Sequence, residues 1–101
     1  MIYQLSVPAA VPGVEEIRIL EWHGEAGASF EPGDLVVELE THKAIVEVRA
    51  GQKGTLRAIL AEPGDWKAIG LRLALFSDEA DEALPALDVE AGDLLVEFDV
   101  T

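Results

Sequence analysis

The stretch ELETHKAIVEV, residues 38–48, places a lysine amine between two segments that read as β-strands. Thr41, His42 and Lys43 join these segments, without the Gly, Pro, Asn or Asp that usually supply the special dihedral angles of a tight turn. A lysine at such a position is most often only a solvated charge. The position also presents a primary amine to other molecules from a stiff support, so the chemistry of Lys43 depends on its surroundings.

Other kinds of reactive site find little support in the sequence. The 101 residues contain no cysteine, which excludes a disulfide framework, a thiolate metal site and a thiol nucleophile. No grouping of Ser, His and Asp suggests a nucleophilic site, and no Gly-rich loop has the phosphate-binding pattern. No cluster with metal-ligand spacing accompanies His23, so we expect a surface histidine there and no metal site. Lys53 and Lys67 lie in or beside turns and are expected to be solvated.

The charge is unevenly distributed along the chain. The net charge of −13 makes nucleic acids and anionic membranes poor partners. Residues 1–77 hold 11 acids and seven Lys or Arg, whereas residues 78–101 hold nine acids and no base. The N-terminal segment lacks the features of a signal peptide, and no window approaches the roughly 18 apolar residues of a membrane span. We therefore expect a cytoplasmic protein.

Short apolar segments separated by Gly and Pro dominate the chain. Six segments are expected to be strands: residues 2–7, 14–22, 35–40, 44–48, 55–60 and 71–76. Turn residues occur about every ten positions, which favours an all-β sandwich or barrel. Residues 78–83 are too short and too acidic for a convincing helix. We expect Arg18, Arg49, Arg57 and Arg72 to pair with carboxylates on the strand faces.

The glycines also indicate an internal repeat. Gly27 and Gly33 lie six residues apart, as do Gly64 and Gly70, and the two pairs are offset by 37 residues. Each pair precedes an apolar strand. Two such units would pack face to face, because neither can bury its apolar side alone. Lys43 then lies where one unit passes into the other, at one end of the molecule.

The residues around Lys43 match a known family. Over roughly residues 5–77 the chain resembles the biotinyl/lipoyl carrier domains, specifically the lipoyl type of 2-oxoacid dehydrogenase acyltransferases and of the glycine-cleavage H-protein. ELETHKAIVEV is similar to the family's E-T-D-K-A-x-V-E-V hairpin, with Thr41 and Ala44 in place and His42 where Asp is commonest. The resemblance implies that Lys43 carries lipoic acid in an amide bond.

The resemblance also gives roles to residues around the hairpin. It implies that lipoylating enzymes read Glu40, three residues before the lysine. Glu47, Gly27 and Gly54 fall at positions that the family also keeps, and they are predicted to belong to the same recognition set. Glu40→Ala should then slow lipoylation more than it lowers stability.

A lipoyl group would make this chain a carrier with a swinging arm. Its roughly ten single bonds would reach about 14 Å. The dithiolane would supply the sulfur that the protein lacks, accept an acyl or aminomethyl unit and be reoxidised by thiol–disulfide exchange. The implied partners are a lipoate ligase or lipoyl transferase, an acyl- or aminomethyl-loading enzyme and a dihydrolipoyl dehydrogenase. The protein itself would not be a catalyst.

Two alternatives remain open from the sequence. A biotin carrier places Met on both sides of its lysine, whereas His42 and Ala44 stand here. An unmodified interaction module of the same fold would need no attached group. An acyltransferase would continue into a linker and a catalytic domain, so we expect either a free-standing carrier or an excised domain, with the N-terminal Met favouring the former.

The predicted fold is a flattened β-barrel of two antiparallel sheets related by a pseudo-two-fold axis, with Lys43 at a hairpin tip and the ends of residues 1–77 opposite. The expected core residues are Val37, Leu39, Val46, Val48, Leu56, Ile59, Leu73 and Leu75. Residues 78–101 are predicted to be an acidic extension. Residues 90–99 echo residues 31–40, so residues 93–99 should add a strand to a sheet edge away from Lys43, after an acidic loop over residues 78–88.

Overall fold

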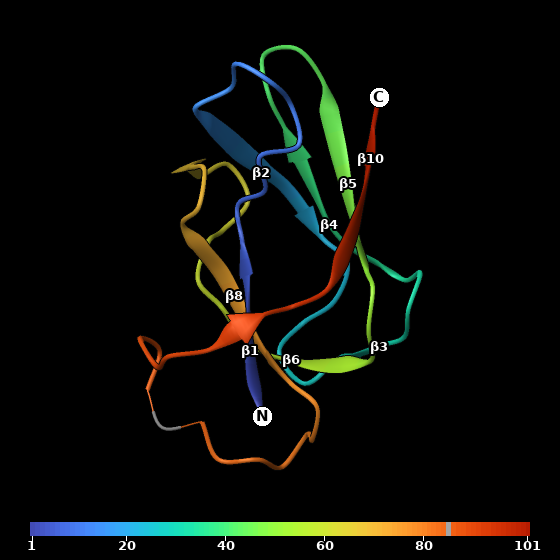
Figure 1. The fold of residues 1–101 in the computed structure, drawn as a ribbon, viewed down its shortest axis with the longest axis vertical. Helices are drawn as coiled ribbons and strands as arrows, with labels where there is room; N and C mark the ends of the chain where they lie inside the picture. Colours follow the sequence, from blue (N-terminus) through green and yellow to red (C-terminus); the bar gives the residue numbers. More distant parts are fainter. Residues whose placement is uncertain (85) are drawn as a thin grey trace.

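The computed structural model describes residues 1–84 and 86–101 as two facing β-sheets (Figure 1). Sheet A has the strand order β3-β6-β8-β1-β9, and sheet B has the order β10-β5-β4-β2-β7. The strands are β1 (Ile2–Ser6), β2 (Glu16–Trp22), β3 (Ser29–Phe30), β4 (Leu35–Glu40), β5 (Ile45–Ala50), β6 (Gly54–Ile59), β7 (Trp66–Ala68), β8 (Arg72–Ser77), β9 (Gly92–Asp93) and β10 (Val96–Val100). The prediction of an all-β flattened barrel is confirmed.

The six longer strands of residues 1–77 fall where alternation of apolar residues predicts them. β3, β7 and β9 were missed, because two or three residues are too few to show a period. None of the elements in the described part of the chain is a helix that could cross a membrane.

The internal repeat is present in three dimensions. Strands β3, β6, β8, β1 and β9 of sheet A correspond in order to β7, β2, β4, β5 and β10 of sheet B. Gly27, Gly33, Gly64 and Gly70 all have φ between 90° and 99°, a conformation that glycine adopts without steric cost. Their amides make equivalent hydrogen bonds: Gly27 to Leu56, Gly64 to Ile19, Gly33 to Ala50 and Gly70 to Val7. Ile19 and Leu56, which accept the hydrogen bonds of Gly64 and Gly27, are themselves separated by the same offset of 37 residues.

The core lies between the two sheets. The largest fully buried apolar side chains are Phe76, Ile19, Leu39, Leu56, Leu73, Leu75, Val36, Val37, Val46 and Val48. Burying one such side chain is worth about 1.5–3 kcal/mol relative to leaving it exposed. Seven of the eight predicted core residues are buried, whereas Ile59, at the end of β6, is half-buried against the core.

The C-terminal tail adds a strand to each sheet. β9 pairs in parallel with β1 at the edge of sheet A, and β10 pairs antiparallel with β5 at the edge of sheet B. Between them Leu94 is buried in the core, and its amide donates to Gln4 O at 2.9 Å. The tail therefore crosses from one sheet to the other.

The predicted location of the tail strand was wrong. Residues 96–100 form β10, but it lies on the sheet that carries Lys43 and runs toward the hairpin, where Thr101 and Ile45 exchange two backbone hydrogen bonds of 2.9 Å. The C-terminus thus returns to the end opposite Met1 (Figure 1). Sequence alternation identified the strand but carries no information on which free edge it joins. Phe98 also remains 41% exposed instead of being covered.

In the part of the chain that the structure describes, two arginines of sheet A do not pair with carboxylates as expected. Arg57 donates to Ser77 Oγ at 3.0 Å, and Arg72 donates to Gln4 Oε1 and to Leu87 O. The interaction with Leu87 holds the loop that follows β8 against sheet A. The predicted acidic loop, residues 78–88, includes residue 85, which lies outside the described residues.

Candidate functional site

The hairpin between β4 and β5 is held by a side chain instead of by a glycine. Thr41 N donates to Ala44 O at 2.8 Å, and Thr41 Oγ1 accepts from Lys43 N at 3.0 Å and from Ala44 N at 2.9 Å. Thr41 is 5% exposed, and no non-glycine residue of the described chain has a positive φ. The hydroxyl group thus closes the turn by a local side-chain bond that Ser and Thr are able to make.

Lys43 lies exposed in this hairpin, which connects β4 and β5 at the top of Figure 1. Across the described residues, no hydrogen bond or ion pair engages its ammonium group. The group lies near the loop between β1 and β2, where a Cβ added at Gly13 would be 3.6 Å from Lys43 Nζ. Sequence reasoning overlooked Gly13, although the Pro-Gly pair in VPGV signals a turn. The amine is therefore free to be modified.

Glu40 lies at the last position of β4, on the outer face of sheet B. Its carboxylate accepts a hydrogen bond from Arg18 Nη2, and the Arg18 guanidinium lies 6.0 Å from the ring centroid of Trp66. Arg18 Nε is buried without a hydrogen-bond partner in the described residues. The predicted recognition carboxylate is thus held in place by a cation that is itself packed against an aromatic ring.

The other predicted recognition residues lie farther from Lys43. Glu47 lies on β5, opposite Glu38, on the same outer face of sheet B. Gly54 pairs with Phe30 in sheet A, and Gly27 donates to a carbonyl of the same sheet. The full length of β5 separates these glycines from the hairpin, roughly 20 Å at 3.3 Å per residue. The structure brings together Glu40 and the hairpin residues Thr41, His42 and Ala44, but not the two glycines.

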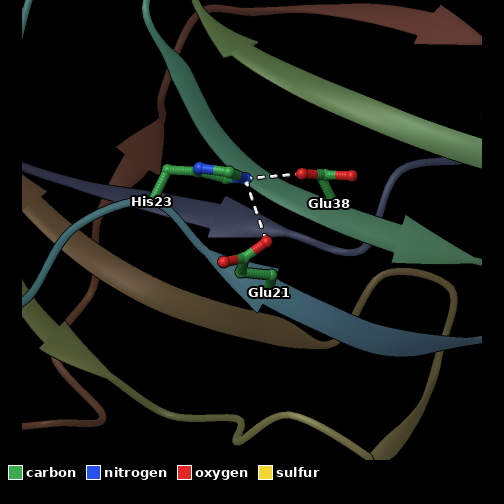
Figure 2. Close-up of side chains that lie close together, drawn as sticks. All are labelled: Glu21, His23 and Glu38. Atoms are coloured by element: carbon green, nitrogen blue, oxygen red, sulfur yellow. Dashed lines mark hydrogen bonds and ion pairs between the residues drawn. The ribbon is translucent and has the colours of Figure 1, made fainter.

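The surroundings of His23 differ from the prediction. His23 Nε2 lies 2.6 Å from Glu38 Oε1 and 3.8 Å from Glu21 Oε2, and the three ligand atoms all lie within 4.8 Å of one another (Figure 2). His23 is exposed, as predicted, but two carboxylates accompany it, which the spacing along the chain did not reveal. Glu38 is 15 residues away in the chain, so only the pairing of β2 with β4 brings it close.

Fold and hairpin together define a carrier domain that presents a lysine at one end of a two-sheet barrel. The family model for biotin/lipoyl domains, described as "Biotin-requiring enzyme", matches residues 3–74. The chain belongs to this family.

Curated relatives place the match within multienzyme complexes. The chain is 35% identical over 75 residues to the "Dihydrolipoyllysine-residue succinyltransferase component of 2-oxoglutarate dehydrogenase complex" of Staphylococcus saprophyticus, covering 74% of this chain and 18% of that protein. It is 34% identical over 77 residues to the "Pyruvate dehydrogenase complex protein X component, mitochondrial" of Chaetomium thermophilum, covering 75% and 17%. The chain spans less than a fifth of these relatives' length.

Proposed function

We propose that this chain is a lipoyl carrier in which Lys43 Nζ forms an amide bond with the carboxyl group of lipoic acid. The observation that carries the proposal is an exposed amine, without a partner among the described residues, at the tip of a hairpin in a biotinyl/lipoyl barrel. Relatives named as dihydrolipoyllysine-residue transferases support lipoic acid over biotin. His42 and Ala44 support the same choice, because they stand where biotin carriers have Met.

The residues around Lys43 fit an attached arm. Thr41 fixes the backbone of the turn, so that the lysine leaves the barrel in a defined direction. Gly13 keeps the neighbouring loop free of a side chain beside Lys43 Nζ. Glu40, held by Arg18, offers a fixed carboxylate that a lipoylating enzyme would read.

Bound lipoic acid supplies a dithiolane, a redox-active group that carries an acyl or aminomethyl unit. The protein contributes the position of the arm and the surface that enzymes recognise. We propose that the chain itself is not catalytic. Its partners would be a lipoate ligase or lipoyl transferase, an acyl- or aminomethyl-loading enzyme and a dihydrolipoyl dehydrogenase. The names of the relatives favour a 2-oxoacid dehydrogenase complex. A cytoplasmic location stays a prediction.

Intact mass tests the attachment. The chain is produced in cells supplied with both lipoate and biotin, and its mass is compared with that of Lys43→Ala, Lys53→Ala and Lys67→Ala. We expect one lipoyl increment in the native chain and in the Lys53 and Lys67 variants, and none in Lys43→Ala. The exposed tip costs little stability when it is truncated, so Lys43→Ala should unfold at the same temperature as the native chain.

Each other result would count against a specific part of the proposal. A lipoyl increment that persists in Lys43→Ala would refute the site. A biotinyl increment would refute the cofactor, and an unmodified native chain would favour an interaction module. The function as a redox carrier is measured separately, by reduction of the lipoylated chain with NADH and a dihydrolipoyl dehydrogenase.

A further inference from the structure

Four carboxylates form a row across the outer face of sheet B. Asp99 on β10 lies opposite Glu47 on β5, Glu47 opposite Glu38 on β4, and Glu38 opposite Glu21 on β2. Like charges directly opposite each other on neighbouring strands destabilise a sheet. Arg49 relieves one half of the row, because its guanidinium lies 3.0 Å from Asp99 Oδ2 and 3.7 Å from Glu47 Oε1.

In the other half of the row, formed by Glu38 and Glu21, the cationic role that Arg49 plays in the first half is open to the imidazole of His23. A shift in register between Ile19 and Glu21 places Glu21, instead of Leu20, opposite Glu38. Such bulges in strands redirect side chains. Two residues later, His23 N donates to Val36 O at 2.9 Å, which fixes the backbone of His23 beside β4. As a result, His23 Nε2 points at both carboxylates (Figure 2).

We propose that Glu21, His23 and Glu38 form a binding site for a divalent cation of the zinc type. One imidazole nitrogen and two carboxylate oxygens are a donor set that Zn²⁺ accepts, with water in a fourth position. A tetrahedral ion with bonds of about 2.0–2.1 Å needs its ligand atoms about 3.4 Å apart. Glu38 Oε1 must therefore move away from Nε2, now at 2.6 Å, and Glu21 Oε2 must move closer from 3.8 Å.

The side chains are free to make these small movements. Glu21 is 67% exposed, and the His23 and Glu38 side chains are about 30% exposed, so rotation of either carboxylate meets little steric resistance. A doubly charged ion at this point would neutralise the half of the row that Arg49 does not reach. It would also link β2 to β4 beside the bulge. The cross-strand pair of Arg18 and Glu40 joins the same two strands nearer the hairpin.

Calorimetry with Zn²⁺ tests the site. The whole chain is used without a polyhistidine tag and without lipoic acid, because imidazoles and the thiols of a reduced arm would themselves bind zinc. His23→Gln removes the nitrogen ligand, and His42→Gln is the matched control, because His42 is exposed in the hairpin away from the row. We expect His23→Gln to weaken zinc binding at least about tenfold, as changes around metal ligands do, and His42→Gln to leave the affinity unchanged.

A second measurement locates the ion independently of any variant. In a titration of the native chain followed by NMR, the His23 imidazole nitrogens should shift with zinc while those of His42 stay in place. Glu38→Gln should weaken binding in the same way as His23→Gln, and Mg²⁺, which prefers oxygen ligands alone, should bind more weakly than Zn²⁺.

Three results would overturn the proposal. One is the absence of zinc binding up to about 1 mM ion, the weakest affinity worth assigning to a site. The second is equal affinity of the native chain and His23→Gln, which would mean that zinc only collects in the acidic field of the protein. The third is loss of binding in His42→Gln. None of these outcomes bears on the attachment of lipoic acid to Lys43, which is tested by mass.

Discussion

At each end of the barrel, one pair of antiparallel strands ends in an equivalent position of the repeat, but the two strands are connected differently. At one end Glu40 pairs with Ile45, and the chain continues from β4 to β5 through the hairpin that bears Lys43. At the other end Ser77 pairs with Ile2, in the same position of the repeat, but no short connection joins the two strands. The symmetric fold therefore offers two equivalent corners. Only the corner with a continuous turn holds a lysine at a fixed tip.

The open corner is used for a different purpose. From Ser77 the chain continues into the acidic extension, which adds β9 to β1 and β10 to β5. Because β1 and β5 are equivalent strands of the repeat, the tail covers the equivalent edge of each of the two sheets. Free strand edges promote association between chains, so a tail that pairs with both edges protects the domain. The difference between the corners shows how one repeat supports a site at one end and a closing segment at the other.

The largest expected effect comes from removing the tail. Truncation after Ser77 should lower the free energy of unfolding by at least about 2–5 kcal/mol, the cost of emptying the buried site of one leucine. Leu94→Ala should reproduce this loss, because Leu94 is 5% exposed, whereas Leu95→Ala should stay within about 0.5 kcal/mol, since Leu95 is 64% exposed. Urea unfolding measures all three. Equal stability of the truncated and native chains would show that the tail is only an appendage.

A smaller effect is expected where the tail packs against Gly51, the residue that follows β5. A Cβ at Gly51 would lie 3.0 Å from the backbone of Leu95, so Gly51→Ala should displace the tail and cost about 1–3 kcal/mol. Gly92→Ala is the control in the same tail, because its Cβ would meet only Tyr3, at 3.9 Å. Amide exchange of Val96–Val100 should become faster in the Gly51 variant alone. Unchanged protection there would contradict the close contact between Gly51 and the tail.

The hairpin corner is tested through its threonine. Thr41→Val removes the acceptor for two backbone amides and should cost about 1–2 kcal/mol, because the amides lose their partner. Thr55→Val is the control, since Thr55 is about as buried, but within the described residues its hydroxyl makes only one side-chain hydrogen bond, of 3.5 Å, to Ser29. The Thr41 variant should also be lipoylated more slowly, as measured by the rate of the mass increment. Equal costs for the two substitutions would mean that the hydroxyl does not hold the turn.

The smallest effect is expected at the open corner. The amine of Met1 lies 2.7 Å from Asp78, and hydrogen bonds to Asp78 and then Glu82 raise the pKa of the amine from its ordinary 8.0. The same hydrogen bond lowers the pKa of Asp78 from 3.8. Any contribution of the pair to stability is present between these two values, and it is lost as the pH rises through the raised amine pKa or falls through the lowered carboxyl pKa.

Because both groups are exposed, solvent screens the pair. Asp78→Asn should leave the unfolding temperature at pH 7 unchanged within error, as should the control Asp81→Asn. A clear loss in Asp78→Asn alone would mean that the ion pair helps to close this corner.

Local pattern was enough to predict most strands and the repeat. The alternation in residues 35–40 and 44–48 and the positive-φ glycines at equal spacing reflect steric rules that act over a few residues. The motif around Lys43 identified the family for the same reason, because its residues are contiguous in the chain. The assignment of lipoic acid to Lys43 stays a prediction that mass measurement will decide.

The sequence by itself determined the β-class, the repeat and the place of Lys43 in a hairpin, because turn glycines and strand alternation are local properties of the backbone. Tertiary structure alone decided which free edge the tail joins and which side chains meet across strands. Glu38 and His23, or Glu40 and Arg18, become neighbours only through the register of β2 against β4. The shift between Ile19 and Glu21 decides which residue of β2 faces Glu38. Pairing energies between strands depend on contacts far apart in the chain, and no local pattern encodes them.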